Sequence, residues 1–487
     1  MDLLSQVTIV AYIGVLGILS VYGLHRYFIL YLYFKYYRRR GAVTPPPMGP
    51  ADYPRVTVQL PIFNEYYVAE RVIDSVGSLD YPRDRLTVQI LDDSTDDTQD
   101  IARAAGERLA AKGFNVQYLH RNDRSGFKAG ALAAGLERST DELVAIFDAD
   151  FVVPSDFLMR TVPYFQDERV GMVQSRWGYL NRDYSLLTRL QSILLDGHFM
   201  LEHTARFSSG RFFNFNGTGG VFRRIAIDEA GGWEGDTLTE DLDLSYRAQM
   251  AGWKFVFVPG LVCRSELPVD IFGFKNQQHR WTKGSIQVGK KLLAPMWRSR
   301  LPLRVKLEAT FHLTANLCYL LIVLLSLLLP LSLVLRHHLW LNGVELWEIL
   351  VFVFTTVSVF AFYLTSQREI YPDWKWRLKD VPMILALGIG MCINNAWAVS
   401  EALLGRQTPF VRTAKYRIEN LRDNWKRKIY RSINSRSLLA EIIFSVYMCA
   451  TLLALFKLEN WGAMPYLLLF VTGYLYILGL SLFHAKR

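Results

Sequence analysis

The sequence predicts an α/β domain inserted between transmembrane α-helices, on three observations. Apolar residues make up 51% of the 487 residues and charged residues only 21%. The apolar residues concentrate before residue 41 and after residue 308, and between them short β-branched runs alternate with helical patterns. This composition excludes a disordered chain, and four cysteines in such a length exclude a disulfide scaffold. The net charge of +10 does not indicate nucleic acid, because the basic residues cluster beside apolar runs.

The block from residue 41 to residue 300 is predicted to hold a mostly parallel sheet. It opens after Pro45–Pro46–Pro47, which is typical of a linker. Strands that alternate with helices need crossover connections, and ligands bind beyond the carboxyl ends of such strands. Asp92–Asp93 and Asp148–Ala149–Asp150 each close a predicted strand, so we expect both acidic clusters at one edge. The predicted strands are Arg55–Leu60, Leu86–Leu91, Val116–His120 and Leu143–Asp148, and the predicted helices are Tyr66–Leu79, Thr98–Lys112 and Lys128–Arg138.

Five apolar segments are predicted to cross a membrane, because each approaches the roughly 20 residues that a bilayer requires. The first, within residues 1–40, ends in Lys35 and Arg38–Arg39–Arg40. No small-residue cleavage site precedes these arginines, which predicts an uncleaved helix and not a signal peptide. The other four are Leu313–Leu335, Ile349–Gln367, Ile442–Phe456 and Trp461–Phe483.

The basic residues set the predicted orientation. Residues 405–437 hold ten Lys or Arg against two Asp or Glu, so this segment and Lys35–Arg40 should both be cytoplasmic. Since Leu313–Leu335 leads out and Ile349–Gln367 leads back, Val381–Leu404 is predicted to be an interfacial amphipathic helix, with an ordinary sixth span as the alternative. The predicted segments are the transmembrane helix 1–40, the domain 41–300, the transmembrane and interfacial helices 301–404, the cytosolic loop and basic segment 405–437, and the transmembrane helices 438–487.

A series of short motifs runs in a fixed order along the chain. Together they resemble the membrane-integrated processive glycosyltransferases of family 2, which are the cellulose synthases and, more closely, the cellulose-synthase-like mannan and glucan synthases. The resemblance covers about Pro54 to Lys415 and implies a cytosolic, Rossmann-type glycosyltransferase domain of the GT-A kind. The motifs are Pro61–Ile62–Phe63–Asn64–Glu65, Leu91–Asp92–Asp93–Ser94, Lys128–Ala129–Gly130, Asp148–Ala149–Asp150, Phe215–Asn216–Gly217–Thr218, Thr239–Glu240–Asp241, and Gln277–Gln278–His279–Arg280–Trp281, the Q-x-x-R-W signature of processive members.

The resemblance implies a nucleotide-sugar donor bound with Mg²⁺ or Mn²⁺. A hard divalent cation on oxygen ligands neutralises the diphosphate charge. Asp150 is expected on the metal, with Asp148 beside it and oriented to the nucleotide sugar. Asp92 is expected to contact the base, and Asp93 to support it. Lys128 opens a helix, where its charge and the helix dipole both favour phosphate.

Thr239–Glu240–Asp241 is expected to supply the general base. A sugar hydroxyl is a poor nucleophile, so a carboxylate must accept its proton as the glycosidic bond forms. Asp241 is expected in this role, with Glu240 beside it. A single inverting displacement then gives a β-linked product from an α-linked donor.

Gln277, Arg280 and Trp281 lie on a predicted helix, where residues three apart share a face. Arg280, with Gln277 beside it, can pair with the leaving diphosphate, and Trp281 offers a flat apolar surface to the acceptor sugar. Asn216 and Gly217 belong to a glycine-rich turn that is expected to let the acceptor approach the backbone. A tight turn without a ligand is the alternative.

A segment beyond the domain resembles the gating-loop motif F-x-V-T-x-K of the same family. The run here is Phe410–Val411–Arg412–Thr413–Ala414–Lys415, with Arg412 where the pattern has Val. Thr413 and Lys415 are expected to reach the diphosphate. His198 and His203 are expected to be structural.

The expected function is therefore a processive, inverting β-glycosyltransferase that polymerises sugar from a nucleotide-sugar donor, with UDP-glucose favoured and GDP-mannose next. The polymer would leave through a channel for which Tyr319, Trp347, Trp397 and Tyr447 are candidate lining residues. The expected partners are the donor, the growing polysaccharide and the lipid bilayer, with no nucleic acid. The expected location is the cell membrane, or the Golgi membrane in a eukaryote.

Three alternatives remain open. A non-processive enzyme that adds a sugar to a lipid or lipid phosphate explains the acidic clusters but not Gln277–Trp281. A hyaluronan or chitin synthase is less favoured, because the motif forms at Phe215–Thr218 and Thr239–Asp241 look more like the mannan and glucan branch. A transporter or scaffold is disfavoured, because no transmembrane run from Leu313 onward shows the buried charges or interrupted paired helices of a transport site.

Overall fold

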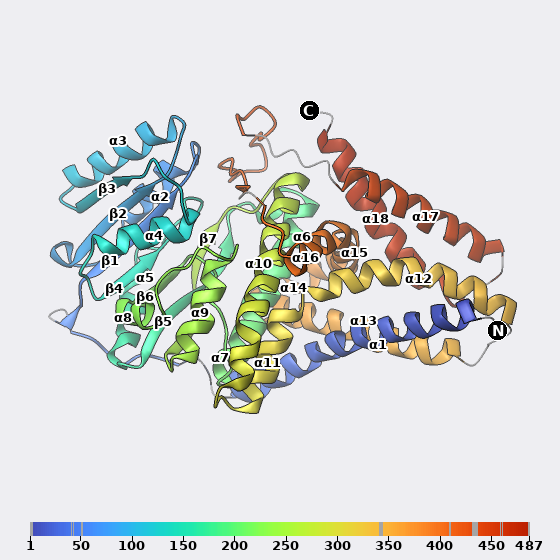
Figure 1. Cartoon of the computed structure of the whole chain (residues 1–487). Helices are drawn as coiled ribbons and strands as arrows, with labels where there is room; N and C mark the ends of the chain where they lie inside the picture. Colours follow the sequence, from blue (N-terminus) through green and yellow to red (C-terminus); the bar gives the residue numbers. More distant parts are fainter. Residues whose placement is uncertain are drawn as a thin grey trace.

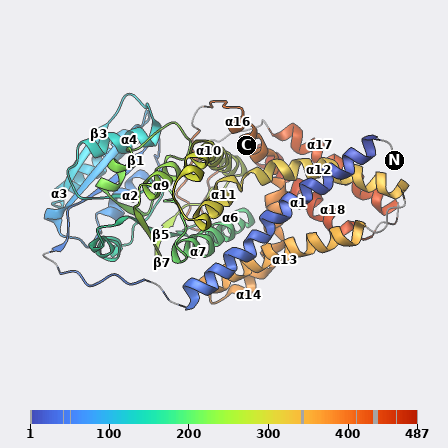
Figure 2. The same cartoon turned by 60° about the horizontal axis from the view of Figure 1, so that its bottom comes forward.

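The structure, a computed structural model, describes residues 3–39, 41, 43–49, 52–339, 344–408, 411–430, 437–457, 459 and 461–485. A sheet domain lies at one end and a block of long helices at the other (Figure 1). Helix α10, Ile271–Arg298, lies where the two parts meet in both views (Figures 1 and 2). Phe410 of the predicted gating motif and Arg40 of the basic run fall outside the described residues.

The sheet has seven strands in the order β3-β2-β1-β4-β6-β5-β7. All neighbouring strands pair in parallel except β6, which is antiparallel to both β4 and β5. The prediction of a mostly parallel sheet is confirmed. The strands are β1 Val56–Ile62, β2 Leu86–Asp92, β3 Asn115–His120, β4 Leu143–Ile146, β5 Val170–Tyr179, β6 Gly220–Arg223 and β7 Lys254–Ser265.

Helices cover both faces of this sheet, and the central strand β4 is apolar on both sides. Val58 and Leu60 of β1 belong to one buried cluster, whereas Val144 and Ile146 of β4 belong to the cluster on the other face. The crossover helices begin and end close to the predicted positions. The helices of the domain are α2 Ala69–Val76, α3 Thr98–Ala111, α4 Phe127–Glu137, α5 Phe157–Thr161, α8 Arg224–Glu229 and α9 Glu240–Met250.

The remaining helices form the second block. Helix α6 passes into a π-helix, His198–His203, before α7 continues it. Helix α1 also ends in a π-helical turn, Tyr33–Arg38. The helices of this block are α1 Leu3–Leu32, α6 Leu186–Gly197, α7 Thr204–Ser208, α11 Leu303–Thr314, α12 Leu317–Leu339, α13 Val344–Ile370, α14 Trp374–Arg377, α15 Val381–Gly390, α16 Cys392–Leu403, α17 Leu438–Lys457 and α18 Met464–Ala485.

Among the described residues, four helices are long and apolar enough to cross a membrane: Ser5–Arg38, Leu350–Ile370, Leu438–Lys457 and Met464–Ala485. The number rises to six if each of two bent helix pairs is one span. The crossing predicted at Leu313–Leu335 falls in the first pair, where α11 and α12 meet at 56°. Several predicted spans therefore exist as helices of suitable length and composition.

The segment 381–404 forms two helices and not the single helix that the sequence predicts, and its interfacial location stays a prediction. It forms α15 and α16, and the second bent pair turns by 43° between them. Gly390 lies against Gly473 of α18, where a Cβ would come within 2.3 Å of the Gly473 carbonyl oxygen. Apolar side chains of α15 are buried on several faces because it packs among other helices instead of lying on a surface.

Candidate active site

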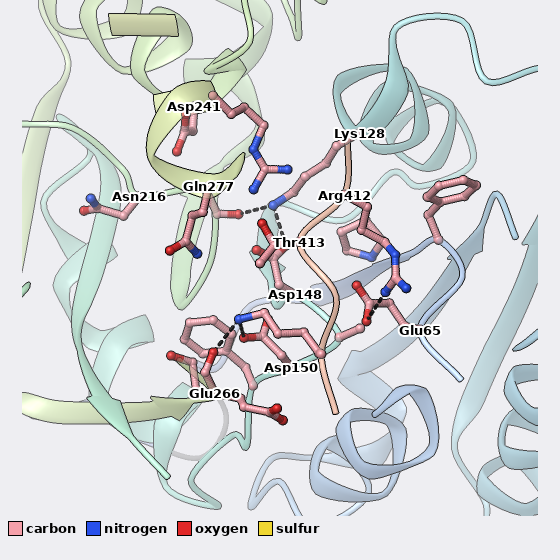
Figure 3. Close-up of a pocket in the computed structure, with 18 of the residues that line it drawn as sticks. Glu65, Lys128, Asp148, Asp150, Asn216, Asp241, Glu266, Gln277, Arg412 and Thr413 are labelled. Carbon is pink, nitrogen blue, oxygen red and sulfur yellow. Dashed lines mark hydrogen bonds and ion pairs between the residues drawn. The ribbon is translucent and has the colours of Figure 1, made fainter. Parts of the chain in front are cut away.

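A cleft lies at the carboxyl ends of the central strands, bounded by α10 and by the loop that contains Arg412 (Figure 3). Both acidic strand ends contribute to it, as the topology predicts. Every predicted site residue lines this cleft except Asp92. The lining residues from that prediction are Asp93, Lys128, Asp148, Asp150, Asn216, Gly217, Glu240, Asp241, Gln277, Arg280, Trp281, Thr413 and Lys415.

Asp148 and Lys128 form an ion pair in the middle of the cleft. The Lys128 ammonium also donates a hydrogen bond to the Gly217 carbonyl at 2.8 Å, and the Asp148 N–H donates to the Thr218 hydroxyl at 2.8 Å. Burial alone would lower the pKa of Lys128, but the carboxylates of Asp148, Glu240 and Asp241 outweigh it and raise that pKa. The lysine therefore stays positively charged beside three acidic groups.

Asp241 lies in the first turn of α9, which begins at Glu240. Its Oδ1 accepts a hydrogen bond from the Leu242 N–H at 2.8 Å. Burial, and then the neighbouring charge of Glu240, raise the pKa of Asp241 to about 7, although Lys128 opposes the shift. Gly217 has φ of +81°, and a Cβ there would lie 3.0 Å from Asp241 Oδ2. The turn needs glycine for both reasons, and a carboxylate titrating near neutrality suits a general base.

Helix α10 supplies the next wall of the cleft. Gln277, Arg280 and Trp281 all reach it from this one helix, as their spacing predicts. Burial lowers the pKa of Arg280, against the attraction of Glu240, Asp148 and Asp241. The Trp281 ring centroid lies 6.5 Å from that of Trp177 on β5. Trp177 was not among the predicted residues, because no strand was predicted at Val170–Tyr179.

The loop after α16 reaches into the cleft with two positively charged side chains. Lys415 Nζ lies 2.7 Å from Asp150 Oδ2, and Arg412 Nη1 lies 2.8 Å from Glu65 Oε2 (Figure 3). Burial raises the pKa of Glu65 to about 7, while Arg412 acts to lower it. The residue that departs from the family pattern, Arg412, thus meets the acid that ends the Pro61–Glu65 motif.

Two further residues that the sequence analysis missed hold this loop. The Glu266 backbone carbonyl accepts a hydrogen bond from Lys415, and Glu266 Oε1 accepts one from the Tyr416 N–H at 2.8 Å. Arg71 donates to the Asp150 carbonyl at 3.0 Å and lies 3.7 Å from Glu266 Oε2. Glu266 follows β7 directly, so its position after a strand was the available signal, whereas nothing in the sequence singles out Arg71.

Asp92 lies beside the cleft and is fully buried. Its carboxylate accepts hydrogen bonds from the Ser94 N–H at 2.9 Å and from the Tyr118 hydroxyl at 2.6 Å. Asp93 lines the cleft and pairs with Arg121 through two hydrogen bonds, at 2.8 and 2.6 Å. The base contact expected of Asp92 stays a prediction, since its polar atoms are engaged inside the domain.

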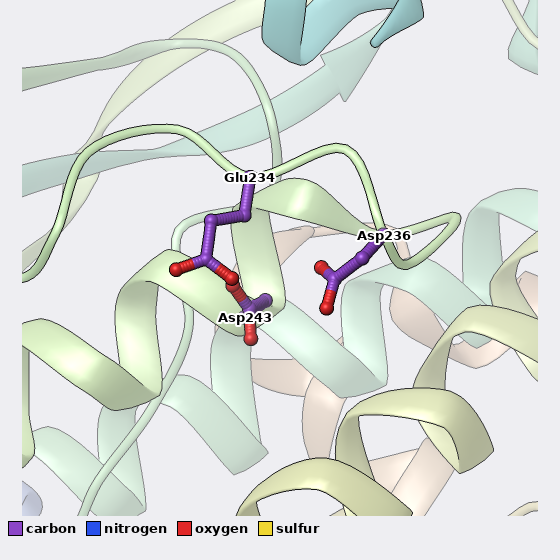
Figure 4. Close-up of side chains that lie close together, drawn as sticks. All are labelled: Glu234, Asp236 and Asp243. Atoms are coloured by element: carbon purple, nitrogen blue, oxygen red, sulfur yellow. The ribbon is translucent and has the colours of Figure 1, made fainter.

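A second acidic group joins Glu234 and Asp236, from the loop before α9, to Asp243 in the first turn of α9 (Figure 4). Lys291 Nζ lies 2.9 Å from Asp236 and 3.0 Å from Asp243, and Arg247 pairs with Asp243 at 2.7 Å. Two cations thus offset most of the charge of the three acids, and Lys291 ties α9 to α10, which is a structural use of the acids.

The part of the chain that forms this cleft matches a known family. Residues 54–284, which contain the sheet and most of the cleft, match the family described as "Glycosyltransferase like family 2". The protein therefore carries a family-2 glycosyltransferase domain, and the resemblance stated from the motifs is confirmed.

Individual relatives narrow the comparison. The chain is 42% identical over 276 residues to "Glucomannan 4-beta-mannosyltransferase 1" of Oryza sativa subsp. japonica, covering 56% of this chain and 52% of that protein. It is 43% identical over 258 residues to "Glucomannan 4-beta-mannosyltransferase 2" of Arabidopsis thaliana, covering 52% and 48%. It is 38% identical over 377 residues to "Probable glucomannan 4-beta-mannosyltransferase 3" of Oryza sativa subsp. japonica, covering 73% of this chain and 66% of that protein. The chain thus spans about half the length of the first of these curated relatives.

A solved structure agrees with the fold. The mannosyltransferase from Pyrobaculum calidifontis, in complex with GDP-Man and Mn²⁺, superposes with a TM-score of 0.52 at 21% identity, over 83% of this chain and 100% of that one. The likeness supports the GT-A-like α/β fold that the motifs imply.

Proposed function

We propose that this protein is a membrane-integrated, inverting and processive β-mannosyltransferase that builds a β-linked polysaccharide from GDP-mannose. One observation carries the proposal: Asp241, with a pKa of about 7, lines the same cleft as the Lys128–Asp148 pair and Trp281. A proton acceptor, a phosphate-side cation and an apolar sugar platform in one cleft are what sugar transfer to a hydroxyl requires.

The choice of GDP-mannose as donor is supported by the relatives. The sequence analysis favours UDP-glucose, whereas the curated relatives are named as mannosyltransferases and the structural neighbour was solved with GDP-Man. Both sugars share the diphosphate chemistry, so the cleft cations suit either. GDP-mannose therefore moves from second choice to first.

Asp150 and Asp148 would hold Mg²⁺ or Mn²⁺. Both carboxylates line the cleft beyond β4, and oxygen is the donor that these hard cations prefer. Asp150 Oδ2 is paired with the Lys415 ammonium here, so this carboxylate already binds one cation. The metal, when bound, would supply charge neutralisation on the diphosphate.

The protein residues would then perform one displacement. The acceptor hydroxyl gives its proton to Asp241 as its oxygen bonds to the anomeric carbon, and the bond from that carbon to the diphosphate oxygen breaks. Lys128 and Arg280 stabilise the negative charge on the departing nucleoside diphosphate. Trp281 and Trp177 would hold the acceptor ring, and Gln277, Thr413 and Lys415 would orient the donor.

The proposal keeps the five-segment organisation, with 41–300 as a cytoplasmic catalytic domain on a multi-pass protein of the cell or Golgi membrane. It also keeps export, because α10 brings Trp281 next to the helical block. Tyr319 packs between helices, Trp397 is 54% exposed, and the Tyr447 hydroxyl donates to the Leu327 carbonyl. The side chain of the fourth candidate, Trp347, lies outside the described residues.

Purified protein in nanodiscs with Mn²⁺, offered labelled GDP-mannose, UDP-glucose and other nucleotide sugars in parallel, tests the proposal. GDP-mannose should give a polymer that endo-β-mannanase digests. A polymer from UDP-glucose alone would overturn the donor, and a single sugar on a lipid would favour the non-processive alternative. In sealed vesicles with the catalytic domain outside, exported polymer should resist added hydrolase until detergent is supplied.

A further inference from the structure

Two histidines hold the side chain of Asn216: His203 is fully buried and His198 is partly exposed. His203 Nε2 lies 2.7 Å from Asn216 Oδ1, and Asn216 Nδ2 lies 3.0 Å from His198 Nε2. The Asn216 amide points away from the middle of the cleft in Figure 3. Both ends of the amide are therefore engaged inside the protein, although the sequence analysis expects Asn216 to contact the acceptor and the histidines to be structural.

The π-helix allows both histidines to contact Asn216. An α-helix turns once in 3.6 residues, so two residues five apart lie about 140° apart around it. The i→i+5 hydrogen bonding of a π-helix brings such residues close to one face. His198 and His203 begin and end the π-helix, and their ring centroids are 4.3 Å apart. Irregular turns of this kind recur at functional sites.

The hydrogen-bond partners fix the tautomers. His203 Nε2 faces two oxygens, Asn216 Oδ1 and the Asn214 carbonyl at 3.0 Å, so it must carry the proton. Burial keeps His203 neutral by lowering its pKa well below the usual range. Asn216 Nδ2 can only donate, so His198 Nε2 accepts and the His198 proton lies on Nδ1, which faces Glu202 Oε2 at 3.1 Å.

Asn216 opens the turn that holds three groups of the cleft. The Gly217 carbonyl receives Lys128, the Thr218 hydroxyl receives the Asp148 N–H, and the Gly217 Cα faces Asp241. A rotation of Asn216 would shift this turn, and with it the donor-side lysine and the base. The backbone N–H of Asn216 is also fixed, because it donates to Gln174 Oε1 at 3.1 Å.

The contacts of His198 extend into the helical block. Glu202 Oε2 lies 3.3 Å from Arg206, Arg206 lies 3.1 Å from Glu308 on α11, and Glu308 lies 2.9 Å from His25 on α1. His198 also donates to Glu202, so these side chains form one connected series. Arg206 and Glu308 are almost fully buried in it, whereas His198 and Glu202 are 25% and 28% exposed. This series of contacts connects a helix with the composition of a membrane span to the turn at Asn216 and Gly217.

We propose that His198 and His203 are positioning residues for sugar transfer: they lock Asn216, and through it hold Gly217 against Lys128 and Asp241. Asn216 then acts by placing the turn and not by binding the acceptor with its amide. The proposal rests on the proposed function for its kinetic readout only, because the geometry of the turn does not depend on which sugar is transferred.

The test compares His198→Gln and His198→Leu in the full chain in nanodiscs. A glutamine oxygen can accept from Asn216 and its amide can donate to Glu202, so His198→Gln should keep at least half of the wild-type kcat. His198→Leu should lower kcat about tenfold to hundredfold, the cost of a misplaced catalytic group. In the Asn216→Ala background the same leucine change should have little further effect, since coupled residues are not additive. Asn115→Ala, which removes a surface amide hydrogen bond on β3, is the matched control.

A second measurement does not need activity. Amide hydrogen exchange of residues 214–219 should be faster in His198→Leu than in the wild type or in Asn115→Ala, at an unchanged melting temperature. The positioning role would be overturned if His198→Leu matched the wild type in both amide exchange and kcat. It would also be overturned if His198→Gln and His198→Leu lost the same share of kcat. Wild-type protein that transfers nothing from GDP-mannose would instead refute the proposed donor, and the kinetic comparison would then use the donor that it does accept.

Discussion

Two groups of buried charges, one in the helical block and one in the cleft, show opposite designs. Lys275 of α10 and Glu441 of α17 are each about 1% exposed, and Lys275 Nζ lies 2.5 Å from Glu441 and 2.8 Å from Ser481 Oγ. One cation meets one carboxylate there, and hydroxyls complete the contacts. In the cleft, Lys128 faces Asp148, Glu240 and Asp241 together, and the pKa of Asp241 rises to about 7.

The difference teaches how to separate structure from chemistry in this protein. A balanced buried pair needs no ligand, and its loss should cost stability. The charged groups of the cleft can still bind a metal, a diphosphate or a proton. Substitutions there should therefore lower activity or ligand binding more than stability. The following predictions are ordered from the largest expected free-energy effect to the smallest.

Asp241→Asn should lower polymer formation by about 10²- to 10⁴-fold, because the amide conserves volume but cannot accept a proton. Binding of GDP with Mn²⁺, measured by calorimetry, should persist. Asp236→Asn, at an exposed acid outside the cleft, is the control. Activity above about a tenth of the wild type would remove Asp241 from the base role.

Lys275→Met should destabilise the protein by about 3–5 kcal/mol, because it leaves Glu441 charged and buried without a cation. Thermal unfolding in detergent measures this loss. The double variant Lys275→Met/Glu441→Leu should recover most of it, since the buried charge is gone. If the single variant melts like the wild type, the contrast between the two groups of charges fails.

Asp150→Ala should weaken binding of GDP with Mn²⁺ about a hundredfold, or about 2.7 kcal/mol, because a carboxylate ligand of the metal is lost. Asp156→Ala, at an exposed acid paired with Arg160, should leave binding unchanged. Unaltered metal dependence in Asp150→Ala would place the metal elsewhere.

Activity should fall about tenfold for each pH unit below the pKa of Asp241, which is about 7. The base must be ionised to accept a proton, so the rate rises with pH and levels off above that value. Stability should move the other way. An aspartate in the unfolded chain has a pKa of about 3.9, so the raised pKa favours the protonated folded form and stability declines as pH rises towards 7.

The pH profile of kcat/KM, which reports the pKa values of the free enzyme, measures this prediction, and Glu65→Gln provides its control. Glu65 also titrates near 7 but lies on the loop side with Arg412, so its replacement should leave the kinetic limb in place. A limb that disappears in Glu65→Gln would transfer the base role away from Asp241.

Arg412→Val, which restores the residue of the family pattern, should have the smallest effect, about 0.2–1 kcal/mol or up to several-fold in KM for the donor. The Arg412 and Glu65 side chains are only 13% and 14% exposed. Glu65, with a pKa of about 7, can take up a proton when the guanidinium is removed, and Lys415 still anchors the loop on Asp150. A loss as large as that of Asp150→Ala would show that the loop depends on Arg412.

Part of the site was predictable because its signals are local. Asp148 and Asp150 follow a short apolar strand, Asp241 opens a helix, and Gln277, Arg280 and Trp281 share one helix. All of them reach one cleft. The sequence analysis failed where distant segments meet. It found no buried charges from Leu313 onward, yet Glu401 is paired with Lys283 at 3.0 Å and Glu441 with Lys275.

The sequence by itself determined the alternation of strands and helices, the acidic strand ends and the apolar helices, because periodicity and residue type act over a few neighbouring residues. Only the tertiary structure decided the break of 381–404 into α15 and α16, the pairing of Lys415 with Asp150, and the grip of His198 and His203 on Asn216. Each of these depends on which distant surfaces pack together, a choice made by burial and hydrogen bonding across the whole fold and carried by no local pattern.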